Sequence, residues 1–214
     1  GLGAALDAVS RGFRVALFER SDFTKGTSSR STKLIHGGVR YLQSGQVKLV
    51  REGLKERGLL LKNAPHIVKP LNFFVPAGSF VERMYIGLGL KLYDLLSGRR
   101  RIGWSKPVAP SIAMQSLPNL SSSKRTGGIF YSDGQFDDAR LGIATALTCI
   151  EQGGTVLNYF KVKGLIHEND KVAGVRVMDQ LSDSEYEVKG KAVVNATGVF
   201  SDKIVAMSKD SFDH

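Results

Sequence analysis

The sequence predicts an α/β fold that includes a small antiparallel meander. Three segments with apolar residues at helical spacing are each followed by a short apolar or extended run, as expected for helices that pack on a sheet. Further along, three extended runs follow one another and are separated by Asn169-Asp170 and by the sequence LSDS. Helices and strands are therefore expected to alternate along most of the 214 residues.

The first half of the chain contains three predicted helices. Apolar residues recur at helical spacing in residues 1–12, 46–63 and 81–97. The strand RVALFE follows the first helix and ends in Glu19, while Pro65 ends the second helix. Residues 67–77 are predicted to be extended, and Arg99 to Arg101 follow the third helix. Residues 105–127 are rich in Ser, Pro, Lys and Gly and predict a surface loop with short turns.

A second organised block begins near residue 128. GIFYSDG predicts a strand, residues 137–152 predict a helix that Asp137 can cap, and TVLNYF predicts another strand. The meander then consists of KVKGLIHE, KVAGVRVMD and EYEVKGK. AVVNATG, residues 192–198, predicts an apolar strand that brings bare backbone to the carboxyl edge of a sheet, where α/β folds bind ligands. An ordinary strand-to-turn exit would have the same sequence.

Composition narrows the classes of function. Hydrophobic residues make up 42% of the chain, which allows a sizeable core, and no apolar run reaches the roughly 18 residues needed to span a bilayer. A lone Cys149 excludes an internal disulfide framework and fits a reducing compartment, and the four scattered histidines show no metal-ligand spacing. The net charge of +10 favours an anionic partner without identifying it.

Half of a dinucleotide-binding motif stands at the N-terminus. Gly1 and Gly3 open a helix, and Glu19 ends the next strand eighteen residues after Gly1. In a βαβ unit, such glycines let a helix N-terminus approach a pyrophosphate, and an acid about 20 residues further on binds a ribose. Gly1 would be the last glycine of GxGxxG, with the rest of the motif before residue 1. A helix–strand pair with incidental glycines would look the same.

The segment GTSSRSTKLIHGGVRYL, residues 26–42, combines small residues with cations. Small side chains let backbone N–H groups reach a ligand, and Arg40 offers a planar fork suited to a phosphate, with the Tyr41 hydroxyl beside it. The alternative is a solvated polar loop. Interspersed apolar residues, such as Leu34 and Val39, argue instead for an ordered segment.

Together these pieces resemble a known family. GLGAALDA, RGFRVALFER, GTSSRSTKLIHGGVRYL, DGQFDDARL and NATGVFSD, in this order, are similar to segments of the FAD-dependent glycerol-3-phosphate dehydrogenases. RSTKLIHGGVRYL is close to a signature of that family. The resemblance implies a glutathione-reductase-type, Rossmann-like FAD-binding domain with an inserted substrate-domain segment. It also implies oxidation of sn-glycerol 3-phosphate to dihydroxyacetone phosphate by hydride transfer to flavin, with quinone as the electron acceptor.

The resemblance assigns roles residue by residue. Gly1 and Gly3 would face the pyrophosphate, Glu19 the adenosine ribose, and Val162 would give a backbone contact to adenine. The other cofactor residues implied are Ser28, Ser29, Thr32, Lys33, Leu34, Ala196, Thr197 and Gly198. Arg40 and Tyr41 match positions that meet the substrate phosphate. His36 is a candidate base, although a hydrogen-bonded histidine that shapes the Gly37-Gly38 turn is the favoured interpretation.

Other residues have plainer interpretations. Asp133, Asp137 and Asp138 are interpreted as turn and cap residues, Arg140 as structural or substrate-orienting, and Cys149 as core. The expected domains are a discontinuous FAD-binding domain, residues 1–65 and 128–214, and part of a substrate domain, residues 66–127. Relative to the family, the first strand and a C-terminal part are absent from the sequence, so this stretch alone is expected to bind FAD poorly and to be inactive.

Several alternatives stay open. An oxidase that uses oxygen would have the same residues. A non-enzymatic basic module is disfavoured because few aromatic residues accompany the dispersed cations, so no nucleic-acid partner is expected. An amphipathic helix at residues 81–97, followed by three arginines, could dock on anionic lipid, or could face the core with a solvated basic end. The expected location is the cytoplasm, with peripheral contact at the inner face of the membrane as a hypothesis.

Overall fold

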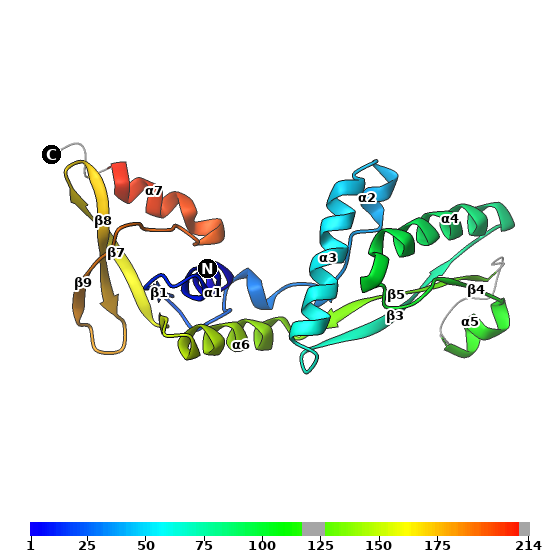
Figure 1. The fold of residues 1–214 in the computed structure, drawn as a ribbon, viewed down its shortest axis with the longest axis horizontal. Helices are drawn as coiled ribbons and strands as arrows, with labels where there is room; N and C mark the ends of the chain where they lie inside the picture. The colour runs from blue at the N-terminus through cyan, green and yellow to red at the C-terminus, as the bar shows by residue number, and fades with distance from the viewer. Residues whose placement is uncertain (117–126, 210–214) are drawn as a thin grey trace. The chain divides into compact units, whose positions relative to one another are not determined.

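A computed structural model gives the fold of residues 1–116 and 127–209 (Figure 1). The chain divides into two compact units. Unit 1 comprises Gly1–Arg30 and Ala139–His214, and unit 2 comprises Ser31–Asp138. These limits differ from the expected domain limits near residues 65 and 128. The assignment of cofactor and substrate roles to domains therefore stays a prediction.

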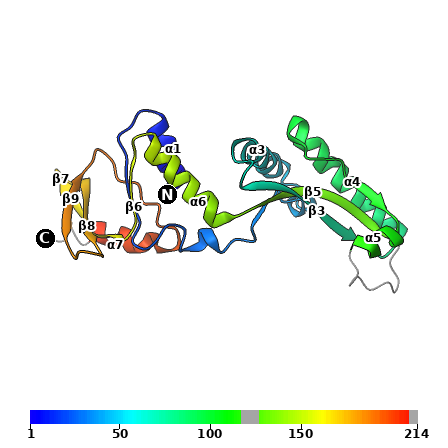
Figure 2. The same ribbon diagram turned by 90° about the horizontal axis from the view of Figure 1, so that it is seen from below.

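Unit 1 contains a short parallel strand pair with two helices packed together beside it. Helix α1 (Leu2–Ser10) leads into β1 (Ala16–Phe18), and α6 (Asp138–Glu151) leads into β6 (Thr155–Leu157). β1 and β6 pair in parallel. The buried residues of this core come from α1, α6 and β6: Ala5, Val9, Ala146, Cys149 and Val156. Figure 2 shows α1 and α6 side by side. Cys149 is fully buried in this core, which confirms its expected core role, and this burial raises the pKa of its thiol.

The predicted meander is confirmed. β7 (Phe160–Glu168), β8 (Lys171–Asp179) and β9 (Glu185–Lys189) form an antiparallel sheet in that order. Asn169 and Asp170 make the first turn with φ values of 51° and 59°, a left-handed conformation that Asn and Asp tolerate better than most residues. The turn η3 (Gly198–Phe200) and helix α7 (Ser201–Lys209) come after the meander.

Unit 2 is a four-stranded sheet with two long helices on one face. The central strand β5 (Gly128–Phe136) pairs along its whole length with β3 (Val68–Pro76). Its other edge pairs with β2 (Leu34–Ile35) at one end and β4 (Lys106–Val108) at the other. Figure 1 shows α3 (Val47–Asn63) and α4 (Phe80–Ser97) over the sheet. The shorter helical elements are α2 (Arg40–Gln43), η2 (Gly98–Arg100) and α5 (Pro110–Ser116).

Local sequence explains where α4 begins. The hydroxyl of Ser79 accepts a hydrogen bond from the Glu82 N–H at 3.1 Å, and the Glu82 carboxylate accepts one from the Gly78 N–H at 2.6 Å. A Ser followed three residues later by Glu is a helix-start signal that satisfies orphan N–H groups. Within the two described ranges, no helix combines the length and apolar character that crossing a membrane requires.

Two expectations about elements were wrong. Residues 192–197 form no strand, and Val194 is 76% exposed, because no strand in the described part of the chain pairs with them. Residues 105–116 are not a loop, since β4 pairs with β5 and α5 follows it. Residues 117–126 of that expected loop lie outside the described residues. Both errors concern strand pairing, which the local sequence does not encode.

Candidate functional site

The N-terminal end of α1 lies close to the loop that carries Ala196. Gly1 is the N-cap residue, and a Cβ atom built on it would lie 3.6 Å from Leu17 Cδ1 and 3.8 Å from Ala196 Cβ. A Cβ atom built on Gly3 would meet nothing within 4 Å. The first turn holds no acidic residue, and the N–H groups of a first helical turn have no intrahelical acceptor. Unit 1 therefore brings the half glycine motif and the NATG sequence together.

Asn195 shapes the loop that contains Ala196, Thr197 and Gly198. Its Oδ1 accepts hydrogen bonds from the Thr197 hydroxyl at 2.7 Å and the Thr197 N–H at 3.3 Å, and its Nδ2 donates to the Ser201 carbonyl at 3.0 Å. Gly198 has a φ of 57°, which glycine adopts without strain. Sequence reasoning missed Asn195. The signal that could have found it is the preference of Asn for hydrogen bonds to backbone two residues on.

Glu19 lies just past the carboxyl end of β1. Its N–H donates to the Leu157 carbonyl at 2.8 Å, and its carbonyl accepts from the Phe160 N–H at 2.9 Å. The Glu19 carboxylate accepts a hydrogen bond from the Ser21 N–H at 2.9 Å. Val162 is two residues beyond Phe160 in β7, partly buried. The predicted ribose and adenine residues are thus neighbours in unit 1.

The segment 26–42 crosses from one unit to the other. Ser28 and Ser29 belong to the 3-10 turn η1 (Thr27–Ser29) in unit 1, with Ser28 exposed. Thr32, Lys33 and Leu34 belong to unit 2, where Thr32 is exposed and Leu34 begins β2. The predicted cofactor residues therefore form two groups, one in each unit.

Lys33 is held by the first residue of α6. Its Nζ lies 2.7 Å from Asp138 Oδ1, and the other oxygen of this buried carboxylate accepts from the N–H and hydroxyl of Ser31 at 3.1 and 2.7 Å. Lys33 has a φ of 59°, and its carbonyl accepts from the Phe136 N–H at 3.0 Å. A strained non-glycine residue held by surrounding bonds is a feature of functional sites. Asp138 lies in the first turn of its helix, as expected, and additionally orders this segment.

Close packing determines the path from Gly37 to Tyr41. A Cβ atom on Gly37 would lie 2.5 Å from Leu54 Cγ, and one on Gly38, where φ is 71°, would lie 2.4 Å from Tyr41 Cδ2. Only glycine fits at either position. Arg40 and Tyr41 then form the first turn of α2, both exposed, and His36 is exposed at the end of β2. Unit 2 therefore presents the three predicted catalytic side chains within one short, well-held segment.

The profile of the FAD dependent oxidoreductase family matches residues 1–213. The chain belongs to the FAD dependent oxidoreductase family. This membership confirms the expected fold class and FAD as the cofactor of the family.

Named relatives agree with the resemblance seen in the sequence. The mitochondrial glycerol-3-phosphate dehydrogenase of Homo sapiens is 44% identical over 220 residues, covering 97% of this chain and 30% of that protein. The glycerol-3-phosphate dehydrogenase of Mycobacterium leprae (strain TN) is 46% identical over 211 residues, covering 98% of this chain and 36% of that protein. This FAD dependent oxidoreductase chain spans about a third of the length of these relatives.

Solved structures share the fold. The glycerol-3-phosphate dehydrogenase from Bacillus halodurans complexed with FAD has a TM-score of 0.73 and 31% identity, covering 97% of this chain and 34% of that one. The L-proline dehydrogenase from P. horikoshii has a TM-score of 0.72 at 22% identity, covering 97% and 52%, and shows the fold alone.

The residues of unit 1 fit the cofactor of an FAD dependent oxidoreductase. The open space above Gly3 gives an anion access to the N–H groups of the first turn of α1. The Glu19 carboxylate stands at the end of the adjacent strand, where a ribose would bind.

Among the residues the structure describes, no group of three or more His, Cys, Asp or Glu side chains could hold a metal ion.

Asp133 is not a turn residue, contrary to the sequence interpretation. It lies in the middle of β5, is 2% exposed, and forms an ion pair of 2.8 Å with Arg57, which is 1% exposed. Ser-Asp-Gly is a turn-like sequence, but the full pairing of β5 with β3 overrides it. This buried pair belongs to a network that sequence reasoning missed entirely.

Proposed function

We propose that this FAD dependent oxidoreductase oxidises sn-glycerol 3-phosphate to dihydroxyacetone phosphate. The observation that carries the proposal is its 44 to 46% identity to glycerol-3-phosphate dehydrogenases over nearly the whole chain. Because the chain spans about a third of those proteins, the activity is proposed for the full-length protein. The more specific roles below rest on particular residues.

Arg40 and Tyr41 are proposed to bind the substrate phosphate. Both side chains are exposed on α2, and their backbone is held by the close packing at Gly37 and Gly38. The stretch from Phe23 to Arg51 contains six Lys or Arg residues and no Asp or Glu. A guanidinium fork makes two parallel hydrogen bonds to a phosphate. A dianionic substrate would therefore be favoured here over a neutral polyol.

The cofactor is proposed to lie along the residues identified from the sequence. Gly1, Gly3 and the Ala196–Gly198 loop would face its pyrophosphate, Glu19 a ribose, and the Val162 backbone the adenine. Ser28, Ser29, Thr32, Lys33 and Leu34 would line the flavin and its phosphates. FAD held by these residues would supply the acceptor for a hydride from the carbon that bears the substrate hydroxyl. His36, exposed beside β2, is the candidate to take the hydroxyl proton.

The first experiment is a visible spectrum of the full-length protein without oxygen, before and after adding sn-glycerol 3-phosphate. Bleaching of the oxidised flavin band is expected. Arg40→Lys retains the charge but loses the fork, so KM is expected to rise by about tenfold. A flavin band that keeps its intensity after the substrate is added would contradict the proposal. The reaction would then be that of another branch of the family. Fast recolouring in air would favour an oxidase, and slow recolouring a dehydrogenase.

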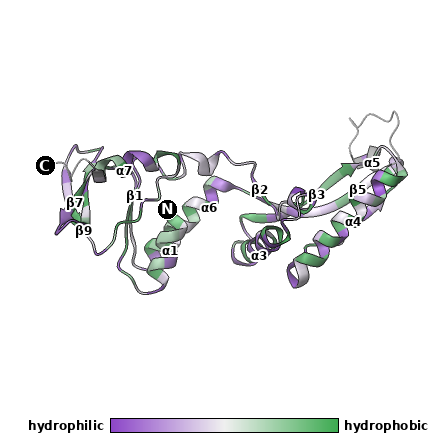
Figure 3. Cartoon of the chain, turned by 90° about the horizontal axis from the view of Figure 1, so that it is seen from above, coloured by the Kyte–Doolittle hydropathy of each residue, from purple (hydrophilic) through white to green (hydrophobic). Residues whose placement is uncertain are grey.

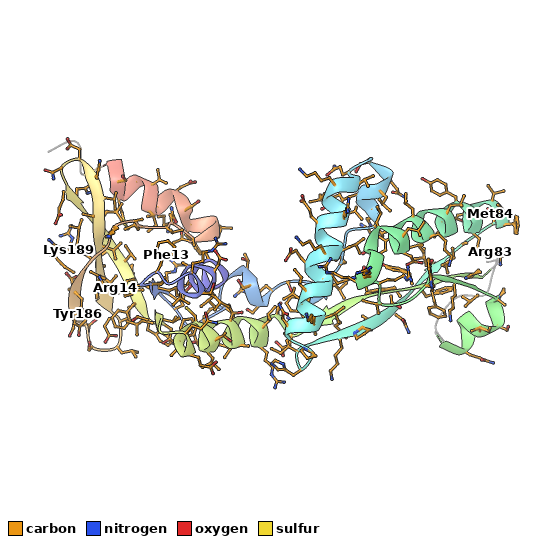
Figure 4. All side chains as sticks on the ribbon, viewed as in Figure 1. Phe13, Arg14, Arg83, Met84, Tyr186 and Lys189 are labelled. Carbon is orange, nitrogen blue, oxygen red and sulfur yellow. The ribbon has the colours of Figure 1, made fainter. Side chains whose placement is uncertain are left out.

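We further propose that electrons pass to a membrane quinone and that α4 contacts the membrane's inner face. The outward side of α4 carries a row of apolar side chains that are 45 to 75% exposed: Val81, Met84, Tyr85, Leu88, Leu92 and Leu95. Figure 3 shows hydrophobic residues recurring along α4, and Figure 4 labels Arg83 and Met84 near its beginning. The exposed cations Arg99 and Arg100 follow the helix. Such a helix suits an anionic lipid surface.

Vesicle flotation tests the membrane proposal. The full-length protein is expected to float with vesicles that contain anionic lipid, and a variant with Met84→Glu and Leu88→Glu is expected to lose most of this binding. Leu181→Glu is the matched control, because Leu181 is 78% exposed in unit 1, far along the chain from α4. Unchanged flotation of the α4 variant would refute the assignment of this helix.

A further inference from the structure

A chain of buried hydrogen bonds connects the ion pair in unit 2 to the backbone before α2. The Gly37 N–H donates to the Tyr93 hydroxyl at 2.7 Å, and this hydroxyl donates to Asp133 Oδ2 at 2.8 Å. Asp133 Oδ1 accepts from Arg57 Nη1 at 2.8 Å. Arg57 Nη2 donates to the Ser97 hydroxyl at 3.1 Å, which donates to the Tyr93 carbonyl at 3.0 Å.

The residues of this hydrogen-bond network are buried. Arg57, Tyr93 and Asp133 are 1 to 2% exposed, and Gly37 is buried. Buried charges are expensive unless they are paired, and apolar residues of similar volume would often stabilise the fold as well or better. Arg57 even leaves its Nε without a partner. These hydrogen bonds contribute little to stability, but each requires a particular orientation of its partners. This suggests that their role is to hold the backbone in one position.

The geometry that it fixes is the backbone just before the phosphate-binding residues. Gly37 is also confined from the other side, since a Cβ atom on Gly53 of α3 would lie 3.1 Å from Gly37 Cα. The Tyr93 hydroxyl determines how far Gly37 approaches α4, and Leu54 and Gly53 determine how far it approaches α3. Three residues later the chain reaches Arg40. The contacts of Gly37 with α3 and α4 therefore influence where the Arg40 guanidinium lies.

We propose that Tyr93, held by the Arg57–Asp133 ion pair, is a positioning residue that fixes the Gly37 backbone and thereby aims Arg40 and Tyr41 at the substrate phosphate. The proposal rests on the proposed function of Arg40 and Tyr41. It assigns substrate affinity to a tyrosine that itself touches no substrate. The expected signature is a loss of phosphate recognition with the hydride-transfer chemistry intact.

The test uses the full-length flavoenzyme with Tyr93→Phe. KM for sn-glycerol 3-phosphate and the inhibition constant of inorganic phosphate are both expected to rise by about tenfold, because Phe lacks the hydroxyl that accepts from Gly37 and donates to Asp133. The value of kcat per bound flavin, and the slow oxidation of glycerol, which has no phosphate, are expected to stay within about twofold. A purely structural role would lower the thermal midpoint and leave both constants unchanged.

Three further variants guard against a folding defect. Gly53→Ala pushes on Gly37 from the side of α3 without removing any hydrogen bond, and is expected to raise the same two constants. Gly89→Ala in α4, where a Cβ atom would meet nothing within 4 Å, and Tyr186→Phe on β9 (Figure 4) are the matched controls and should leave them unchanged. KM is independent of the fraction of enzyme that folds, so reduced yield does not obscure the result.

The outcomes separate this inference from the proposed function. If Arg40→Lys raises KM and neither Tyr93→Phe nor Gly53→Ala does, the positioning role is wrong and the phosphate site stands. If Arg40→Lys leaves both constants unchanged, the phosphate site itself is wrong, and the positioning role is overturned with it. If Arg40→Lys, Tyr93→Phe and Gly53→Ala each raise both constants and leave glycerol oxidation unchanged, the positioning role is supported.

Discussion

At the scale of single residues, the Arg57–Asp133 ion pair makes the stability of unit 2 sensitive to replacement of either partner. Asp133→Asn would leave the Arg57 guanidinium buried without a counter-charge, at 1% exposure. Breaking a buried pair by removing one partner costs about 3–5 kcal/mol. We expect this loss in hydrogen exchange of the α3 and α4 amides, which report on unit 2 itself. Asp170→Asn, at an exposed turn whose left-handed φ suits Asn, should change stability by less than about 0.5 kcal/mol.

Tyr93 makes the stability of unit 2 depend on alkaline pH. Burial first, and then the neighbouring Asp133 carboxylate, raise the pKa of Tyr93 far above its ordinary value of 10.0. Burial and Asp133 also raise the pKa of Tyr131, against the lowering effect of Arg40. The unfolded chain loses these protons near pH 10 while the folded chain keeps them. This contribution to stability is therefore full below about pH 10 and is lost as the pH rises above it.

The measurement is tyrosinate absorbance during an alkaline titration of the full-length protein. Replacing Tyr93 by Phe is expected to leave the reversible titration unchanged and to reduce only the absorbance gained when the protein unfolds. Loss of amplitude in the reversible step would mean that Tyr93 ionises in the folded protein, against the direction of its pKa shift.

At the scale of elements, α4 carries a buried and an exposed leucine only two residues apart in sequence. Leu90 is 3% exposed and Leu88 is 69% exposed. Leu90→Ala is expected to destabilise unit 2 by about 2–5 kcal/mol, because it removes buried methyl groups and leaves a cavity. Leu88→Ala should change stability by less than about 0.5 kcal/mol. The same hydrogen-exchange experiment on α3 and β5 compares the two. Equal losses would mean that the outer side of α4 packs against something in the native protein.

Local periodicity predicted the helices well, because an amphipathic helix shows its burial pattern within its own residues. Residues 1–12, 46–63 and 81–97 are helical with small differences at the ends. Strand pairing was less predictable, since it depends on partners far along the chain. AVVNATG is apolar enough for a strand but has no paired neighbour among the described residues, whereas β4 becomes a strand only through β5.

The same distinction applies to the candidate site. Glycines and cations in residues 26–42 carried a local signal for ligand binding. The groups that hold this segment come from distant positions, such as Tyr93, Asp133 and Asp138. An aspartate followed by glycine looks like a turn until β3 pairs with it, so no local pattern could reveal the Asp133 ion pair. Sequence therefore predicted which residues bind a ligand, and the fold shows which distant groups hold their backbone.

At the scale of the whole chain, charge is the property that bears on the proposed binding of a dianionic substrate. The net charge is +10, and the stretch from Phe23 to Arg51 has cations only. Such a field raises the encounter rate of a dianion and is screened by salt, since the Debye length falls from about 30 Å at 0.01 M to about 8 Å at 0.15 M. We expect kcat/KM for sn-glycerol 3-phosphate to fall several-fold over that range, and the value for neutral glycerol to stay constant.

The source of that salt dependence can be tested with charges outside the proposed phosphate site. Lys48 and Arg51 are exposed on α3. A variant with both replaced by Gln keeps Arg40 and the buried network, so its kcat/KM at high salt should equal that of the unaltered enzyme. At low salt it should be slower, because part of the attracting field has gone. A slower rate at both salt concentrations would show that these cations act at short range, and long-range capture by the basic segment would have to be abandoned.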